Sequence, residues 1–185
     1  MTRLHERSWT HDRSDWGRRL PNRAGGRVLR TSWDEPGPWH DEPDKVQWID
    51  AETDLDCLAV RNHFGAWCGY VGVPPGHPCH GKGYDTLDVR VHGGLTFADQ
   101  CNEDAPEGHG ICHVPLPGRS DAVWWLGFDC GHSMDLAPRV IVIDDIPEPP
   151  PGSPFAKVYR DLPYVQAECA NLARQLADLA RAEPS

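Results

Sequence analysis

The clearest pattern of hydrophobic and polar positions lies near the C-terminus. Apolar residues recur there at spacings of 4, 3, 4 and 3, as they do on one face of an α-helix. Asp161 can cap this helix, and Pro163 suits its first turn. Five apolar positions over four turns favour packing on a sheet over a coiled coil, which needs more heptads. The apolar positions are Val165, Cys169, Leu172, Leu176 and Leu179.

The middle of the chain is rich in β-branched, aromatic and alternating residues, which are typical of strands. Two such runs flank Gly65 and predict a hairpin. The predicted strands are 55–64, 66–73, 87–97 and 122–130, with 140–143 as a possible edge strand. We therefore predict an α+β fold, with a mainly antiparallel sheet of four or five strands and a C-terminal amphipathic helix packed on it.

The length of 185 residues suits a single domain with an extension. Residues 1–45 alternate Arg, acidic residues, Pro, Gly and Trp without a period, which predicts an N-terminal arm that is poorly ordered or wraps on the body. Its four tryptophans favour packing of part of the arm. Residues 46–182 form the predicted domain, with a proline-rich connector at 146–154 before the helix.

Charge is distributed unevenly along the chain. The net charge is −10, yet residues 1–30 hold eight arginines against three acidic residues, a balance of +5 that leaves −15 elsewhere. A body this acidic repels a phosphate backbone, so we do not expect it to bind nucleic acid. The arm could contact RNA, DNA or a partner protein, or it could be a variable extension.

Composition also bears on the compartment. No run of 18 or more apolar residues exists, and residues 1–26 lack the apolar region of a signal peptide, so we expect a cytoplasmic protein with no membrane partner. The seven cysteines are an odd number, and cytosolic thiols stay reduced. A disulfide framework is therefore not expected.

Histidines and cysteines gather in one part of the sequence. Ten of them lie between His77 and His132, which favours a metal site. The spacings of structural zinc sites, Cys-x-x-Cys and His-x3-His, are missing, however. The clustering alone therefore does not identify ligands.

One candidate segment is Val-His-Gly-Gly-Leu-Thr at 91–96. Glycines leave backbone N–H groups uncovered, so Gly93 and Gly94 could bind a cofactor or ligand closely. The alternative is that the glycines form a bulge or tight bend and that His92 is an ordinary half-buried residue.

A second candidate segment follows the last long strand. His132 and Asp135 are three residues apart, and with His92 they would form an open site for a divalent metal, with zinc as the first candidate. Cys130 could also bind zinc, and Asp129 could accept a proton from a metal-bound water. Alternatively, Asp135 caps a turn and His132 makes ordinary polar contacts, or Cys130 is a nucleophile with His132 as its base.

Four motifs together resemble a known but uncharacterised family. They are Trp-Cys-Gly-Tyr-Val-Gly-Val-Pro at 67–74, the segment 91–96, Trp-Trp-Leu-Gly-Phe-Asp-Cys-Gly-His at 124–132, and Tyr-Arg-Asp at 159–161. Over residues 57–177 the chain is similar to small proteins encoded by bacteriophages and actinobacteria. The resemblance implies a phage or prophage origin, a location in the host cytoplasm and an accessory role such as counter-defence. It brings no known activity.

Two classes of function fit these features. The first is a metal-dependent hydrolase that acts on a small polar substrate such as a nucleotide or phosphoester. The second is a non-enzymatic binding module that sequesters a small ligand, for instance a signalling nucleotide, or binds a host protein. Trp67, Trp124 and Trp125 could line an aromatic pocket in either case, although they could equally be core residues. A purely structural role is a third reading.

Overall fold

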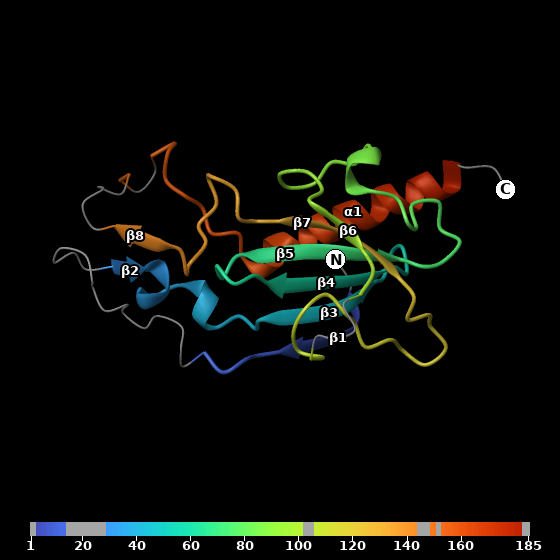
Figure 1. Ribbon diagram of the computed structural model, residues 1–185, viewed down its shortest axis with the longest axis horizontal. Coiled ribbons are helices and arrows are strands. Elements are labelled where there is room, and N and C mark those ends of the chain that lie inside the picture. The colour runs from blue at the N-terminus through green and yellow to red at the C-terminus, as the bar shows by residue number, and fades with distance from the viewer. Residues whose placement is uncertain (1–2, 14–28, 102–105, 144–148, 151–152, 183–185) are drawn as a thin grey trace.

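A computed structural model describes residues 3–13, 29–101, 106–143, 149–150 and 153–182 (Figure 1). It contains a six-stranded antiparallel sheet in the order β1-β3-β4-β5-β7-β6. The strands of this sheet are β1 (Arg3–Trp9), β3 (Lys45–Asp50), β4 (Asp56–Arg61), β5 (Trp67–Val73), β6 (Phe97–Asp99) and β7 (Trp124–Asp129). A second sheet pairs β2 (Leu29–Thr31) with β8 (Ile141–Ile143), and short 3-10 turns occupy Ser32–Asp34, Pro38–His40 and Tyr84–Thr86. The prediction of an α+β fold is confirmed, with one strand more than expected.

The single α-helix of the described residues, α1 (Leu162–Ala182), packs across one face of the sheet (Figure 1). Asp161 caps it as predicted, because its Oδ1 accepts the Tyr164 amide at 2.9 Å. The predicted apolar stripe points into the core, where four of its five residues are fully buried and Leu179 is partly buried. The helix therefore closes a core built on β3, β4, β5 and β7. The buried core residues of the helix are Val165, Cys169, Leu172, Ala173 and Leu176.

The predicted hairpin is also present. β4 and β5 pair from Asp56 opposite Gly72 to Arg61 opposite Trp67, and Gly65 in the turn has a φ of +78°. Strand β7 then pairs with β5, so the C-terminal end of β7 lies at the same end of the sheet as the β4–β5 turn (Figure 1).

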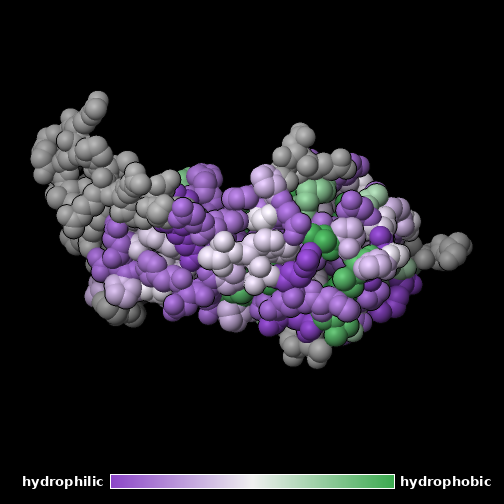
Figure 2. All heavy atoms as spheres, turned by 90° about the horizontal axis from the view of Figure 1, so that it is seen from below, coloured by the Kyte–Doolittle hydropathy of each residue, from purple (hydrophilic) through white to green (hydrophobic). Residues whose placement is uncertain are grey.

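The N-terminal arm belongs to the domain wherever it is described. β1 pairs with β3, and β3 begins at Lys45, so the predicted boundary at residue 45 does not separate two structural parts. Trp33 and Trp39 are buried, so these two residues of the predicted arm pack on the rest of the protein. The side of the molecule that carries β1 is mainly hydrophilic (Figure 2), in keeping with the exposed pattern of this edge strand. Residues 14–28 and most of the predicted connector lie outside the described residues.

The predicted strand at 87–97 is wrong for most of its length. Its alternating apolar residues do pack on the core, but residues 87–95 belong to no strand, and pairing with β7 begins at Thr96, whose amide binds the Gly127 carbonyl at 2.9 Å. Side chains of α1 bind this backbone instead: Gln175 accepts the Arg90 amide at 2.8 Å, and Gln175 and Asn171 donate to the Arg90 carbonyl. An extended segment can thus alternate in polarity without joining a sheet. The apolar residues concerned are Leu87, Val89 and Val91.

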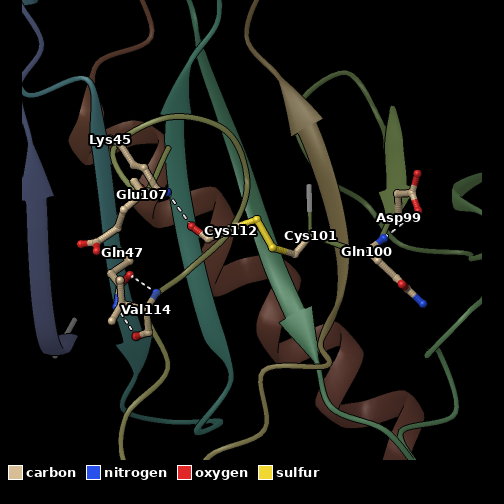
Figure 3. Close-up of a disulfide and its surroundings, with 8 residues drawn as sticks. All are labelled: Lys45, Gln47, Asp99, Gln100, Cys101, Glu107, Cys112 and Val114. Atoms are coloured by element: carbon tan, nitrogen blue, oxygen red, sulfur yellow. Dashed lines mark hydrogen bonds between the residues drawn. A yellow bond between two sulfur atoms is a disulfide. The ribbon is translucent and has the colours of Figure 1, made fainter. Parts of the chain in front are cut away.

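A disulfide between Cys101 and Cys112 closes a loop over the face of the sheet opposite α1 (Figure 3). The ammonium group of Lys45 donates to the carbonyls of Glu107 and Cys112, and the Gln47 amide makes two hydrogen bonds with the Val114 backbone. Burial lowers the pKa of Lys45 to about 8 despite the nearby Glu107 carboxylate. A disulfide framework was not expected from the sequence, and the structure departs from that expectation at this one pair, while the other five cysteines are thiols.

The predicted edge strand at 140–143 is present as β8, but it lies in the small second sheet with β2. No helix in the described ranges combines the length and the apolar character needed to cross a membrane.

Candidate metal site

Two segments far apart in the sequence meet beside the N-terminus of α1. After β7, the Cys130 amide makes a backbone bond to Trp67, and the chain then turns so that the Asp135 amide binds the His132 carbonyl at 2.9 Å. The other segment is a turn in which the Gly94 amide binds the Val91 carbonyl at 3.0 Å. This turn carries His92 against the residues that follow β7.

The side chains of His92, His132 and Asp135 converge, as the sequence predicts. One ligand atom from each lies within 4.8 Å of the others. The Asp135 Oδ2 atom is 2.8 Å from Nε2 of His92 and 3.4 Å from Nδ1 of His132. Bonds of about 2.0 to 2.1 Å in a tetrahedral zinc site place ligand atoms about 3.3 Å apart. These three residues could therefore hold a metal ion after small adjustments.

Asp135 is the most firmly held of the three. Its side chain is 1% exposed, Oδ1 accepts Nε of Arg160 at 3.0 Å, and Oδ2 accepts the His132 amide at 3.1 Å. Burial alone would raise the pKa of Asp135, but the hydrogen bonds from His92 and Arg160 outweigh burial and lower the pKa below its usual value. The carboxylate is therefore ionised at neutral pH. It also caps its turn, as the structural alternative states, and this position is compatible with a ligand role.

His132 lies with its ring directly over the backbone of Gly93. A Cβ atom placed on Gly93 would be only 2.1 Å from Cε1 of His132, and Gly93 has a φ of +66°. The Nδ1 atom of His132 is buried and has no hydrogen-bond partner in the described part of the chain. A buried nitrogen of this kind is available to a cation, and Gly93 is required to make room for its ring.

The prediction that Gly93 and Gly94 offer free backbone amides is not supported for Gly94. Its amide already closes the turn to Val91, and a Cβ at Gly94 would meet nothing within 4 Å. The tight bend considered as the alternative is what the structure contains, and its effect on the site is to accommodate His132.

Cys130 does not belong to the ligand group, so its prediction as a metal ligand is corrected. Its side chain is 1% exposed and lies in the hydrophobic core. Burial, with the nearby Asp135 carboxylate, raises the pKa of the thiol far above its usual value. Without a metal the buried thiol stays neutral and is therefore a poor nucleophile, which argues against the Cys130–His132 nucleophile alternative.

Asp129 lies close to the group without being part of it. Its side chain is 34% exposed, its Oδ1 accepts the Gly131 amide at 2.9 Å, and the same oxygen is 4.0 Å from Nδ1 of His132. A proton-accepting role for Asp129 is compatible with this position and stays a prediction.

Three residues around the site were not predicted as functional. Tyr164 lies with its hydroxyl 2.9 Å from Nδ1 of His92, Glu168 accepts the His92 amide at 2.9 Å, and Arg160 binds Asp135. They follow one another at intervals of four, so one face of α1 and the residues before it support the site. That spacing of polar residues is the signal from which they could have been found.

The other histidines and cysteines of the cluster lie elsewhere. His109 stacks on His11 at 3.8 Å, His113 packs edge-on against Trp125, and His80 lies near Trp124. The crowding in sequence thus separates into several places, of which only the one at His92 forms a metal-ligating group among the described residues.

Comparison with protein-family models, curated proteins and solved structures finds no match to this chain. Only the geometry of the site therefore supports a function for this chain, and the family resemblance stays a prediction.

Proposed function

We propose that the protein binds one divalent cation, with zinc as the first candidate, through His92, His132 and Asp135, and uses it to hydrolyse a small polar substrate. The observation that carries this proposal is the convergence of three ligand atoms from segments about 40 residues apart, one of them a buried nitrogen without a hydrogen-bond partner among the described residues. Two imidazoles and a carboxylate are a ligand set that zinc favours.

The arrangement has features of a catalytic site rather than a structural one. Three protein ligands leave a coordination position for water, whereas structural zinc sites have four. Asp135 is buried, and so is Nδ1 of His132, whereas the His132 side chain as a whole is 38% exposed, so the site lies just beneath the surface on the His132 side. A water bound to zinc has a pKa near 7 and is a usable nucleophile at neutral pH. Asp129, 4.0 Å from His132, is in a position to take up its proton.

The residues around the ligands support the same proposal. Ligating histidines usually hold their second ring nitrogen in a hydrogen bond, and His92 does so with Tyr164. Arg160 fixes the Asp135 carboxylate while its own side chain stays 27% exposed, which suits it to a substrate that carries a phosphoryl group or another anion. A nucleotide or phosphoester substrate and a phage accessory role remain the more specific parts of this proposal.

One observation favours the alternative of a non-enzymatic binding module. Asp135 is already bound by Arg160 and His92, so its charge is compensated without an ion. In that case the partly exposed His132 and Arg160 would recognise an anionic ligand, for instance a signalling nucleotide, with no turnover. Thermal stabilisation of chelator-treated protein by mononucleotides or cyclic dinucleotides would favour this alternative.

The test of the proposed function is metal binding followed by turnover. The full chain without a histidine tag should retain about one equivalent of zinc, and His132→Ala should lose it. His80→Ala is the matched control because His80 lies in a loop beside Trp124. The zinc-loaded protein should hydrolyse a chromogenic phosphodiester, and the chelated protein should not. Metal retained equally by both variants would contradict the site, and bound metal without hydrolysis of phosphodiesters, phosphomonoesters or nucleotides would contradict the activity.

A further inference from the structure

His92 is held through both of its ring nitrogens. Nε2 is 2.8 Å from Oδ2 of Asp135, and Nδ1 is 2.9 Å from the hydroxyl oxygen of Tyr164. The rings of His92 and Tyr164 are perpendicular, with centroids 5.5 Å apart. The side chain of His92 is only 13% exposed, so these two groups determine where its proton lies.

Without a metal, the proton of His92 belongs on Nε2. An ionised carboxylate can only accept hydrogen bonds, so the contact with Asp135 requires an N–H on Nε2. Nδ1 of the neutral ring is then an acceptor, and the Tyr164 hydroxyl must donate to it.

With a metal, the arrangement reverses. Nε2 must present its lone pair to the ion, so the proton of a neutral His92 moves to Nδ1. The partner of Nδ1 must now accept a hydrogen bond. A carbonyl or carboxylate in the place of Tyr164 could only accept, and an N–H group could only donate. A hydroxyl does both by rotation of its hydrogen, with no movement of heavy atoms.

The position of the Tyr164 hydroxyl is itself fixed. The Tyr164 amide binds the capping carboxylate of Asp161 at 2.9 Å, and the guanidinium carbon of Arg160 lies 4.9 Å from the ring centroid. The hydroxyl therefore stays beside His92 in either protonation pattern.

We infer that Tyr164 is a positioning residue that lets His92 exchange its Nε2–H tautomer for the Nδ1–H tautomer when a metal ion binds. This inference rests on the proposed metal site and identifies the residue that allows the empty and the loaded site to share one side-chain arrangement. It also explains why a tyrosine at the first turn of α1, rather than a carboxylate, faces the ligand.

The test combines zinc affinity with the tautomer of His92. Two-bond proton–nitrogen spectra of ¹⁵N-histidine-labelled full chain, recorded at about pH 8 to favour neutral imidazole, should show Nε2–H for metal-free His92 and Nδ1–H after addition of zinc. Tyr164→Phe should keep the Nε2–H form in the metal-free protein but lower zinc affinity by about 10- to 100-fold. Tyr159→Phe is the matched control, because its hydroxyl binds Glu42 at 2.6 Å instead.

The outcomes separate the inference from the proposed function. If wild-type protein binds zinc and Tyr164→Phe binds it equally tightly, the inference is wrong and the metal site stands. Protonation of Nδ1 in the metal-free wild type, alone or together with Nε2, would also overturn the inference. If the wild type shows no zinc-dependent change at His92, His132 or Asp135, the proposed function fails and the inference fails with it.

Discussion

Replacing Gly93 with alanine is expected to weaken metal binding strongly, whereas the same change at Gly94 is expected to preserve it. The two glycines are neighbours in one turn and both have positive φ, +66° and +88°. Both variants therefore carry a backbone strain of about 1–2 kcal/mol in stability. Only one of them places a new atom inside the candidate site.

The magnitude follows from the position of His132. A Cβ at Gly93 would lie 2.1, 2.4 and 2.7 Å from three atoms of the imidazole, while ordinary contacts begin at 3.4 Å. The ring must therefore move by more than about 1 Å, beyond the ~0.5 Å tolerance of a preorganised site. Displacing a ligand should lower zinc affinity by roughly 100-fold or more, at least as much as the about 10–100-fold loss caused by removing an outer-shell partner.

Calorimetric zinc titration of Gly93→Ala, Gly94→Ala and the wild type measures this difference. Thermal unfolding of the metal-free variants shows whether both remain folded and are destabilised to a similar degree. The prediction is refuted if Gly93→Ala and Gly94→Ala bind zinc with the same affinity, whether both keep the wild-type affinity or both lose it.

Three further predictions concern parts of the fold outside the site. Replacing Cys101 and Cys112 with serine should reduce the free energy of unfolding by about 3 kcal/mol, since the disulfide closes a loop with a sequence separation of 11. In this variant Lys45 should become reactive toward amine reagents, and the two other lysines, which are both exposed, serve as internal controls. Unchanged unfolding and unchanged labelling of Lys45 would contradict the closed loop. Because the folded pKa of Lys45 is about 8 against 10.5 when unfolded, the unfolded chain binds more protons between these values, so this residue makes stability rise with pH across that window. A stability difference between wild type and Lys45→Met that stays constant from pH 8 to 10 would argue against it. Glu42→Gln should destabilise the fold by about 2 kcal/mol in urea unfolding, because it removes the negative charge 2.6 Å from the buried Arg61 guanidinium, which then faces only the Asp44 carboxylate at 3.7 Å. A loss below about 0.5 kcal/mol would show that this charge is not essential.

Local sequence patterns predicted the elements whose stability depends on local signals. The helix from Leu162 has a cap, a proline in the first turn and a periodic apolar face, and all three are present in the structure. The hairpin around Gly65 and the strand at 122–130 were likewise recognisable, because their β-prone runs are bounded by turn residues.

Elements that depend on distant partners were not predictable in the same way. β1 is mostly polar and exposed, so its own sequence does not indicate a strand, and it adopts this conformation by pairing with β3 at the edge of the sheet. The segment 87–97 alternates like a strand, yet its backbone is bound by side chains of α1. The disulfide was not predicted, because neither an odd number of cysteines nor an assumed reducing compartment reveals which thiols lie close together.

The candidate site was predictable in part. The spacing of His132 and Asp135 and the glycines after His92 indicated three of the converging residues. Cys130 was a false candidate, because its place near His132 in the sequence does not show that its side chain, directly after β7, points into the core. Tyr164 was overlooked as a partner of His92, since its contact depends on how α1 lies on the sheet.

X-ray absorption spectroscopy at the zinc edge of the tag-free, zinc-loaded full chain tests the central claim most directly. We expect a first shell of nitrogen and oxygen at about 2.0–2.2 Å and the outer-shell scattering of two imidazoles. We expect no sulfur, because Cys130 lies in the core and outside the ligand group. A sulfur shell near 2.3 Å, or a hydrated ion without imidazole scattering, would contradict a site built from His92, His132 and Asp135.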